Sequence, residues 1–135
     1  MTGKELIQKT YRHEPTPRAP WVPFAGVHAG KLLNYDATEV LTDADKLYAS
    51  LMEVNRLYMP DGQPVVFDLQ LEAEILGCDL LWAKDNPPSV TSHPYATTEL
   101  PDKVVGPEDG RMPLVLDVCR RIAEVERRAK ENRDE

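Results

Sequence analysis

The fold is decided by residues 67–77, which read Phe67-Asp68-Leu69-Gln70-Leu71-Glu72-Ala73-Glu74-Ile75-Leu76-Gly77. Apolar and polar residues alternate over 67–75, and this periodicity alone favours one long amphipathic strand. Residues 70–76 nevertheless have strong helix-forming composition, and Gly77 is a natural stop after a helix. We therefore predict a buried strand that ends at about Asp68 and a short helix from about Gln70.

The segments before this stretch complete a repeating unit. Residues 21–25 form a short aromatic and apolar run that ends at Gly26, and we predict a strand there. Thr42 is a good N-cap for a helix over 42–58, whose apolar residues recur at three- and four-residue spacing. After a Pro-Asp-Gly turn at 60–62, the second strand covers 65–68. Strand, helix and strand in this order predict two parallel strands joined by a right-handed crossover.

Four further elements are expected outside this unit. Residues 3–13 read as an amphipathic helix, and 79–83 with 89–93 suit a small β-hairpin. Residues 96–111 form a loop. Pro113 fits the first turn of a last helix, whose apolar stripe consists of Val115, Val118, Ile122 and Val125.

Composition indicates one globular domain of 135 residues with a formal charge of −7. This charge argues against broad binding to nucleic acid or to an anionic membrane. The arginines of 120–128 alternate with acids, which indicates a solvated helix face. The chain has no apolar run of about 20 residues and no apolar segment near Met1, so we expect a cytoplasmic protein. Cys78 and Cys119 lack metal or redox spacing and are interpreted as reduced, buried thiols.

Residues 67–77 also resemble the second-strand signature of the uroporphyrinogen decarboxylase superfamily. Asp68 and Gly77 keep its nine-residue spacing, and Glu74 falls on its glutamate. The Glu72-Ala73-Glu74 triplet is similar to the version found in the related cobalamin-dependent methyltransferases. Residues 28–31 (His-Ala-Gly-Lys) stand where the family has an Ala-Gly loop, and residues 77–90 look like its β-excursion.

The resemblance implies an α/β fold, namely the first βα units of a TIM-type (β/α)8 barrel with a short β-hairpin excursion. A closed barrel of this kind needs about 250 residues. Residues 1–135 are therefore expected to form a partial barrel domain, the N-terminal segment of the family fold, without a complete active site.

Two departures choose between the branches of the superfamily. The decarboxylases carry an arginine two residues before the Ala-Gly pair and another directly after it, whereas this chain has Val27 and Lys31. Lysine keeps the charge but not the fork that matches a carboxylate. The resemblance therefore favours a methyltransferase that moves a methyl group between a small substrate and a corrinoid. The alternatives are a uroporphyrinogen decarboxylase of tetrapyrrole biosynthesis, or a non-catalytic scaffold or partner subunit.

Three residues are the candidate catalytic groups. Asp68, His28 and Lys31 are expected to converge at the carboxyl ends of the two strands. Asp68 could act as an acid, a base or a hydrogen-bond acceptor, or it could only cap the following helix. His28 could position a substrate or be an ordinary loop histidine.

Candidate substrate-binding residues lie on the short helix. These are Gln70, Glu72 and Glu74, although the two glutamates could equally be its solvated face.

Cofactors and partners follow from the resemblance. A complete methyltransferase implies a corrinoid and a zinc ion, and the zinc ligands belong to the later part of the barrel. This chain alone has no His or Cys cluster at ligand spacing and is expected to bind no cofactor by itself. Expected partners are a small-molecule substrate, a corrinoid protein or a complementary barrel fragment, and a second copy of the chain.

Overall fold

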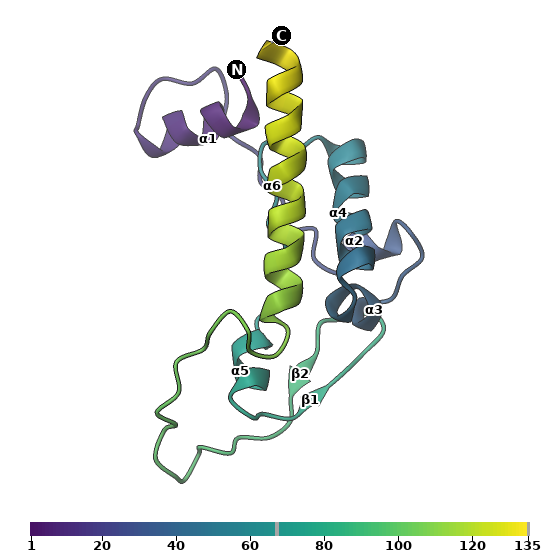
Figure 1. The fold of residues 1–135 in the computed structure, drawn as a ribbon, viewed down its shortest axis with the longest axis vertical. Coiled ribbons are helices and arrows are strands. Elements are labelled where there is room, and N and C mark those ends of the chain that lie inside the picture. The colour runs from purple at the N-terminus through teal and green to yellow at the C-terminus, as the bar shows by residue number, and fades with distance from the viewer. Residues whose placement is uncertain (67, 135) are drawn as a thin grey trace.

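The structure, a computed structural model, describes residues 1–66 and 68–134, with the side chains of 130, 133 and 134 left out. It is mostly helical, with one small sheet (Figure 1). In chain order the elements are α1 (Gly3–Tyr11), α2 (His28–Lys31), α3 (Ala37–Thr42), α4 (Ala44–Tyr58), α5 (Leu71–Ile75), β1 (Leu80–Leu81), β2 (Ser89–Val90) and α6 (Met112–Asp134).

The core is built around α4. Its inward residues Leu47, Leu51 and Val54 are at most 2% exposed, as the helical spacing predicts. They pack against Val40 of α3 and Val118 of α6, both also buried. The long helix α6 lies beside α4 (Figure 1). Burial of these apolar side chains is the main term that holds α2, α3, α4 and α6 together.

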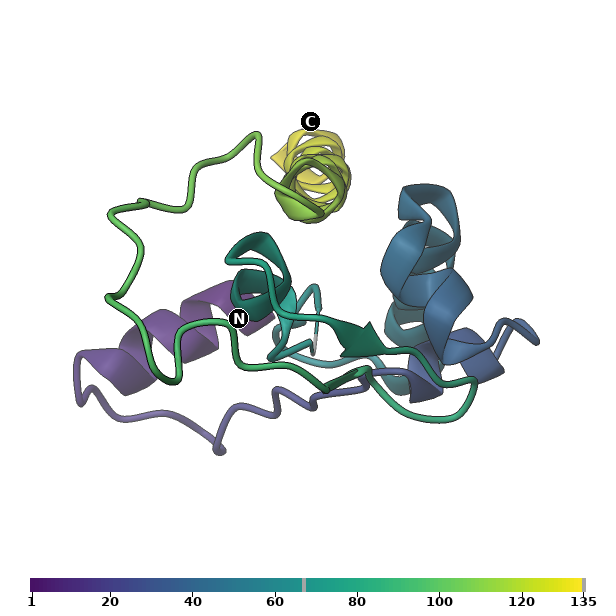
Figure 2. The ribbon, with the colours of Figure 1, turned by 90° about the horizontal axis from the view of Figure 1, so that it is seen from below.

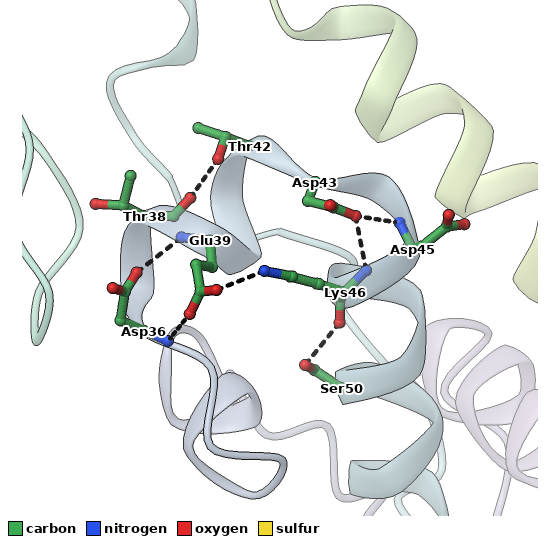
Figure 3. Close-up of polar contacts among 8 residues, drawn as sticks. All are labelled: Asp36, Thr38, Glu39, Thr42, Asp43, Asp45, Lys46 and Ser50. Atoms are coloured by element: carbon green, nitrogen blue, oxygen red, sulfur yellow. Dashed lines mark hydrogen bonds and ion pairs between the residues drawn. The ribbon is translucent and has the colours of Figure 1, made fainter.

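The N-cap of α4 differs from the prediction by one residue. Thr42 is the last residue of α3, and its hydroxyl donates to the Thr38 carbonyl instead of capping a new helix. Asp43 is the N-cap of α4, because its extended backbone interrupts the helix and its carboxylate accepts from Asp45 N and Lys46 N (Figure 3). The prediction of Thr42 as N-cap is therefore wrong.

A capping box begins α3. The Asp36 carboxylate accepts from Glu39 N at 2.9 Å, and the Glu39 carboxylate accepts from Asp36 N at 2.9 Å (Figure 3). The Glu39 carboxylate also accepts a hydrogen bond from the Lys46 ammonium of α4, with which it forms an ion pair. These contacts fix the angle between α3 and α4.

The two predicted strands are not strands in the described residues. Residues 21–25 are irregular, and so are 64–66 and 68, while Phe67 lies outside the described residues. Pro23 lacks the N–H that a ladder needs, which interrupts the first segment. The predicted parallel pairing of 21–25 with 65–68 is therefore wrong for the described residues.

The two segments are nevertheless neighbours. Residues 24–26 and 64–66 line one cavity of about 10 Å³ together with residues of α3 and α4. That volume holds about one water molecule and no substrate. Residues 12–25 run along the side of the molecule opposite α6 (Figure 2).

The remaining predictions of elements are confirmed. The helix expected over 3–13 is α1, the short helix expected from residue 70 is α5, and the last helix is α6. Gly77 ends the turn after α5 with φ +92°, a backbone conformation that glycine favours. The hairpin pairs Leu80 with Val90 and Leu81 with Ser89 in antiparallel register.

The cysteines are less buried than the sequence suggests. Both are free, Cys78 is half-buried, and Cys119 is exposed although its neighbour Val118 is fully buried. Adjacent residues on a helix are about 100° apart, so Cys119 lies beside the apolar stripe and not on it. The expectation of buried thiols is therefore wrong. Among the described residues, we find no helix both long and apolar enough to cross a membrane.

Candidate functional site

Asp68 lies in the turn that leads into α5. Its side chain is 0% exposed. One carboxylate oxygen, Oδ1, accepts a hydrogen bond from Gln70 N at 2.9 Å. This is the local turn that an aspartate makes with the backbone two residues on. Gln70 is the N-cap of α5, so Asp68 fixes the direction in which the helix starts. Asp68 therefore forms a turn directly before the helix and is not its N-cap, because α5 has Gln70 at that position and no side-chain capping hydrogen bond.

Arg111 is the second half of this arrangement. Its Nη1 lies 2.6 Å from Asp68 Oδ2, and its Nε donates to Glu74 Oε2 at 2.7 Å. Nη1 also donates to the carbonyl of Leu41 at 3.0 Å. The guanidinium carbon lies 4.9 Å from the centre of the Trp82 ring. One arginine therefore joins the start of α5, its body, the end of α3 and the hairpin.

The cluster is enclosed and carries unused hydrogen-bonding capacity. The Arg111 side chain is 12% exposed. The close contact of Nη1 with Asp68 Oδ2 is an ion pair without an aligned hydrogen bond. Asp68 Oδ2 and Arg111 Nη2 are buried and find no hydrogen-bond partner among the described residues. Enclosure strengthens the ion pair, and it makes the loss of either partner costly.

Gly110 brings Arg111 to this position. It has φ +49°, and a Cβ on it would come within 2.7 Å of Ile75 Cγ1. The chain can therefore turn from the loop into α6 while it touches α5. A side chain at this position would move Arg111 away from its partners.

His28 and Lys31 have other partners. His28 Nε2 lies 2.8 Å from the Tyr58 hydroxyl, and the two rings stack with centroids 6.0 Å apart. Lys31 Nζ lies 3.3 Å from Asp85 Oδ1, and both side chains are exposed. Both residues belong to the short helix α2, so the expectation of a loop over residues 28–31 is wrong.

The three candidate catalytic residues each have a different partner among the described residues. His28 contacts Tyr58, the last residue of α4. Asp68 reaches Leu41 through Arg111, and Leu41 stands just before the N-cap of α4. The convergence of His28 and Lys31 with Asp68, and the role of each residue, stay predictions.

The three candidate substrate-binding residues differ in exposure and in their partners. Glu72 is exposed, Gln70 is half-buried, and Glu74 is held by Arg111. Glu72 is thus the carboxylate of α5 that solvent and a ligand can reach. Glu74 has a structural partner that sequence reasoning did not assign to it.

Sequence reasoning missed Arg111 and Trp82. Arg111 follows a loop without periodicity, and its partners come from segments 37 and 70 residues away. One signal could have found it: an arginine directly before a helix start is unusual, because that end of a helix favours negative charge. Such an arginine indicates a specific anionic partner.

A metal centre is not assembled by the described residues. They contain no group of three or more His, Cys, Asp or Glu side chains placed to hold a metal ion. The described residues therefore do not fit a zinc ion.

Comparison with known proteins agrees with this arrangement of elements. The sequence profile of the family described as uroporphyrinogen decarboxylase (URO-D) matches residues 2–130, nearly the whole chain. The chain belongs to the URO-D family. This membership of the URO-D family confirms the resemblance seen in residues 67–77 and 28–31.

Two relatives are similar to this URO-D chain. A methylated-thiol–coenzyme M methyltransferase of Methanosarcina mazei is 49% identical over 53 residues, which are 37% of this chain and 14% of the relative. A solved structure, a methyltransferase from Methanosarcina mazei, superposes with a TM-score of 0.76 at 23% identity. The match covers 92% of this chain and 39% of that structure, so the two share a fold over the part they have in common. The chain thus spans well under two thirds of both relatives.

Proposed function

We propose that this chain forms the first part of the barrel of a URO-D family methyltransferase, which moves a methyl group between a small substrate and a corrinoid. The observation that carries the proposal is the 49% identity over 53 residues with a methyltransferase that acts on methylated thiols and coenzyme M. A thiol is accordingly the substrate class proposed for the complete enzyme. A TIM-type barrel is the proposed architecture, completed by strands beyond those described here.

Residues 27–31, which form α2 and its N-cap, support methyl transfer over decarboxylation. A polycarboxylate tetrapyrrole needs several cations, and Val27 supplies none. Lys31 is paired with Asp85, so its charge is already partly balanced. This segment therefore lacks the pair of arginines that such a substrate would engage.

The site residues are proposed in two groups. Glu72 and Gln70 on α5 are accessible and are assigned to substrate contact, together with Lys31 and His28 on α2. Asp68 and Glu74 are bound to Arg111. Asp68 is proposed to be essential because it sets the start of α5. Methyl transfer to a thiol leaves a proton to be taken up, and a carboxylate such as that of Glu72 can accept it.

The experiment is a reconstitution. The chain is co-expressed with the part of the solved Methanosarcina mazei methyltransferase that lies outside the structural match. The purified complex is given a methylated corrinoid and coenzyme M. We expect methylated thiol and demethylated corrinoid, seen by mass spectrometry and by visible absorption. The same complex is given uroporphyrinogen as the competing substrate. Loss of carboxyl groups from uroporphyrinogen without methyl transfer would overturn the proposal in favour of a decarboxylase.

A second candidate function is that of a partner-binding subunit without catalysis. It is favoured by the exposed apolar side chains next to the irregular segments, with Phe24 67% and Leu69 79% exposed. A complementary barrel fragment would cover such residues. Formation of a stable complex in the reconstitution, without turnover of either substrate, would support this candidate.

A further inference from the structure

We infer that Arg111 and Asp68 are positioning residues, which clamp the start of α5 and thereby place the accessible side chains of Gln70 and Glu72 for a ligand. This inference rests on the proposed substrate role of Gln70 and Glu72. It assigns a function to Arg111, and it moves Asp68 from the reacting atoms to their support.

The burial of the pair carries the first step. The Asp68 side chain is 0% exposed and that of Arg111 is 12% exposed. A carboxylate enclosed in this way does not touch a substrate in the described conformation. Glu72, two residues into α5, is exposed. The accessible and the buried acids of this segment therefore have different tasks.

The second step is the shortness of α5. A helix of five residues has too few internal hydrogen bonds to be stable alone. Its own backbone supplies few bonds at its start, where Glu74 N donates to the Gln70 carbonyl at 2.9 Å. The direction of α5 must come from outside, and Arg111 supplies it through Asp68 before the helix and Glu74 within it.

The third step is the geometry of the guanidinium. Its nitrogens meet Asp68, Glu74 and the Leu41 carbonyl from one planar group. Stacking on Trp82 fixes the plane of that group. A lysine offers one compact charge and cannot satisfy the same three acceptors in the same directions. The clamp therefore requires arginine and not only a positive charge.

The test uses amide hydrogen exchange in the full chain. The Gln70 amide reports the clamp, because it donates to Asp68 Oδ1, and the Cys78 amide reports the end of the turn, because it donates to the Ala73 carbonyl. In Arg111→Met we expect exchange at Gln70 to rise about tenfold or more relative to Cys78, since the carboxylate loses its anchor. Arg111→Lys is expected to restore little of the protection.

Arg121 provides the matched control. It also belongs to α6, pairs with Asp45 and stacks on Tyr48 at 4.1 Å, but it does not touch Asp68. Arg121→Met should leave the ratio of Gln70 to Cys78 exchange unchanged. An equal rise at Gln70 in both variants, or equal loss of protection at Gln70 and Cys78 in Arg111→Met, would overturn the clamp as a specific device.

The link to ligand binding is tested in the reconstituted complex. Arg111→Met should raise the KM for the thiol in the wild-type background and have little further effect once Glu72→Gln is present, because Arg111 acts through α5. Equal effects in both backgrounds would overturn the positioning role. A complex that performs no methyl transfer would contradict the proposed function, whereas the exchange measurement would still decide the clamp.

Discussion

Arg111 Nη1 lies 2.6 Å from Asp68 Oδ2 inside the protein, although 43 residues separate them in the chain. The ion pair connects the loop before α6 to the turn before α5. It gives Asp68, the residue that leads the family signature, a buried partner. Two segments that are far apart in the sequence are thus in direct contact in the folded chain.

Asp68→Asn tests the energetic weight of that pair. Asparagine can still accept from Gln70 N, so the local turn survives, but it leaves the Arg111 charge buried without its counter-ion. We expect the free energy of unfolding to fall by about 1–3 kcal/mol. From the sequence alone, a helix cap would be replaced at almost no cost. Asp117→Asn, at an ion pair on the surface of α6, is the control and should stay within about 0.5 kcal/mol in chemical denaturation.

Gly110→Ala tests the turn that delivers Arg111. Its φ of +49° and the 2.7 Å approach of a Cβ to Ile75 predict strain in addition to a displaced arginine. We expect a loss of about 1–3 kcal/mol. Gly106→Ala in the same loop has its nearest neighbour, Asp109 Oδ2, at 3.6 Å and should be nearly neutral. Equal melting temperatures for the two variants would show that Gly110 has no special role.

Asp61 makes stability depend on pH in the acid range. The Arg18 guanidinium, and after it the backbone amide of Trp21, lower the pKa of the Asp61 carboxyl to about 2. In the unfolded chain the same group titrates at about 3.9. The native state therefore binds its proton later, so this stabilisation is present above about pH 4 and is lost as pH falls toward 2.

Arg18→Gln removes the larger cause of that shift. The difference in melting temperature between wild type and Arg18→Gln should be constant from pH 7 to about 5 and shrink steadily below pH 4. Arg12→Gln breaks an exposed pair with Glu14 and serves as the control. A difference that grows at low pH would contradict the assignment to Asp61.

Zinc binding is expected to be weak for this chain alone. Tight zinc sites use three or four Cys, His or carboxylate ligands in a tetrahedral arrangement, and the sequence has no such spacing. After dialysis against a weak chelator, we expect well under one zinc ion per chain by atomic absorption. Stoichiometric zinc that survives this treatment would show that the ligands were misidentified.

Local chemistry explains which elements the sequence could predict. The period of Leu47, Leu51 and Val54 marks the buried face of α4, and Gly77 marks the stop after α5. Such signals lie within a few residues of the feature they indicate. They do not resolve adjacent residues well: the sequence predicts Thr42 as N-cap, whereas the structure has Asp43.

The wrong predictions concern partners distant in the chain. The segments 21–25 and 65–68 have apolar strand composition, but Pro23 interrupts the first, and a strand needs a neighbour that composition does not supply. Arg111 was missed because its acceptors, Asp68, Glu74 and Leu41, are scattered over the chain. Only the folded chain brings them together.

The most direct test of the account is the methyl-transfer rate of the reconstituted enzyme that carries Glu72→Gln. If Glu72 contacts the substrate from α5, its amide should lower the rate by about a hundredfold, at the low end of the 10²–10⁴ range for acid–base groups. Glu108→Gln changes an exposed glutamate of the loop before α6 and should leave the rate unchanged. A wild-type rate in the Glu72→Gln enzyme would contradict the assignment of α5 to the substrate site.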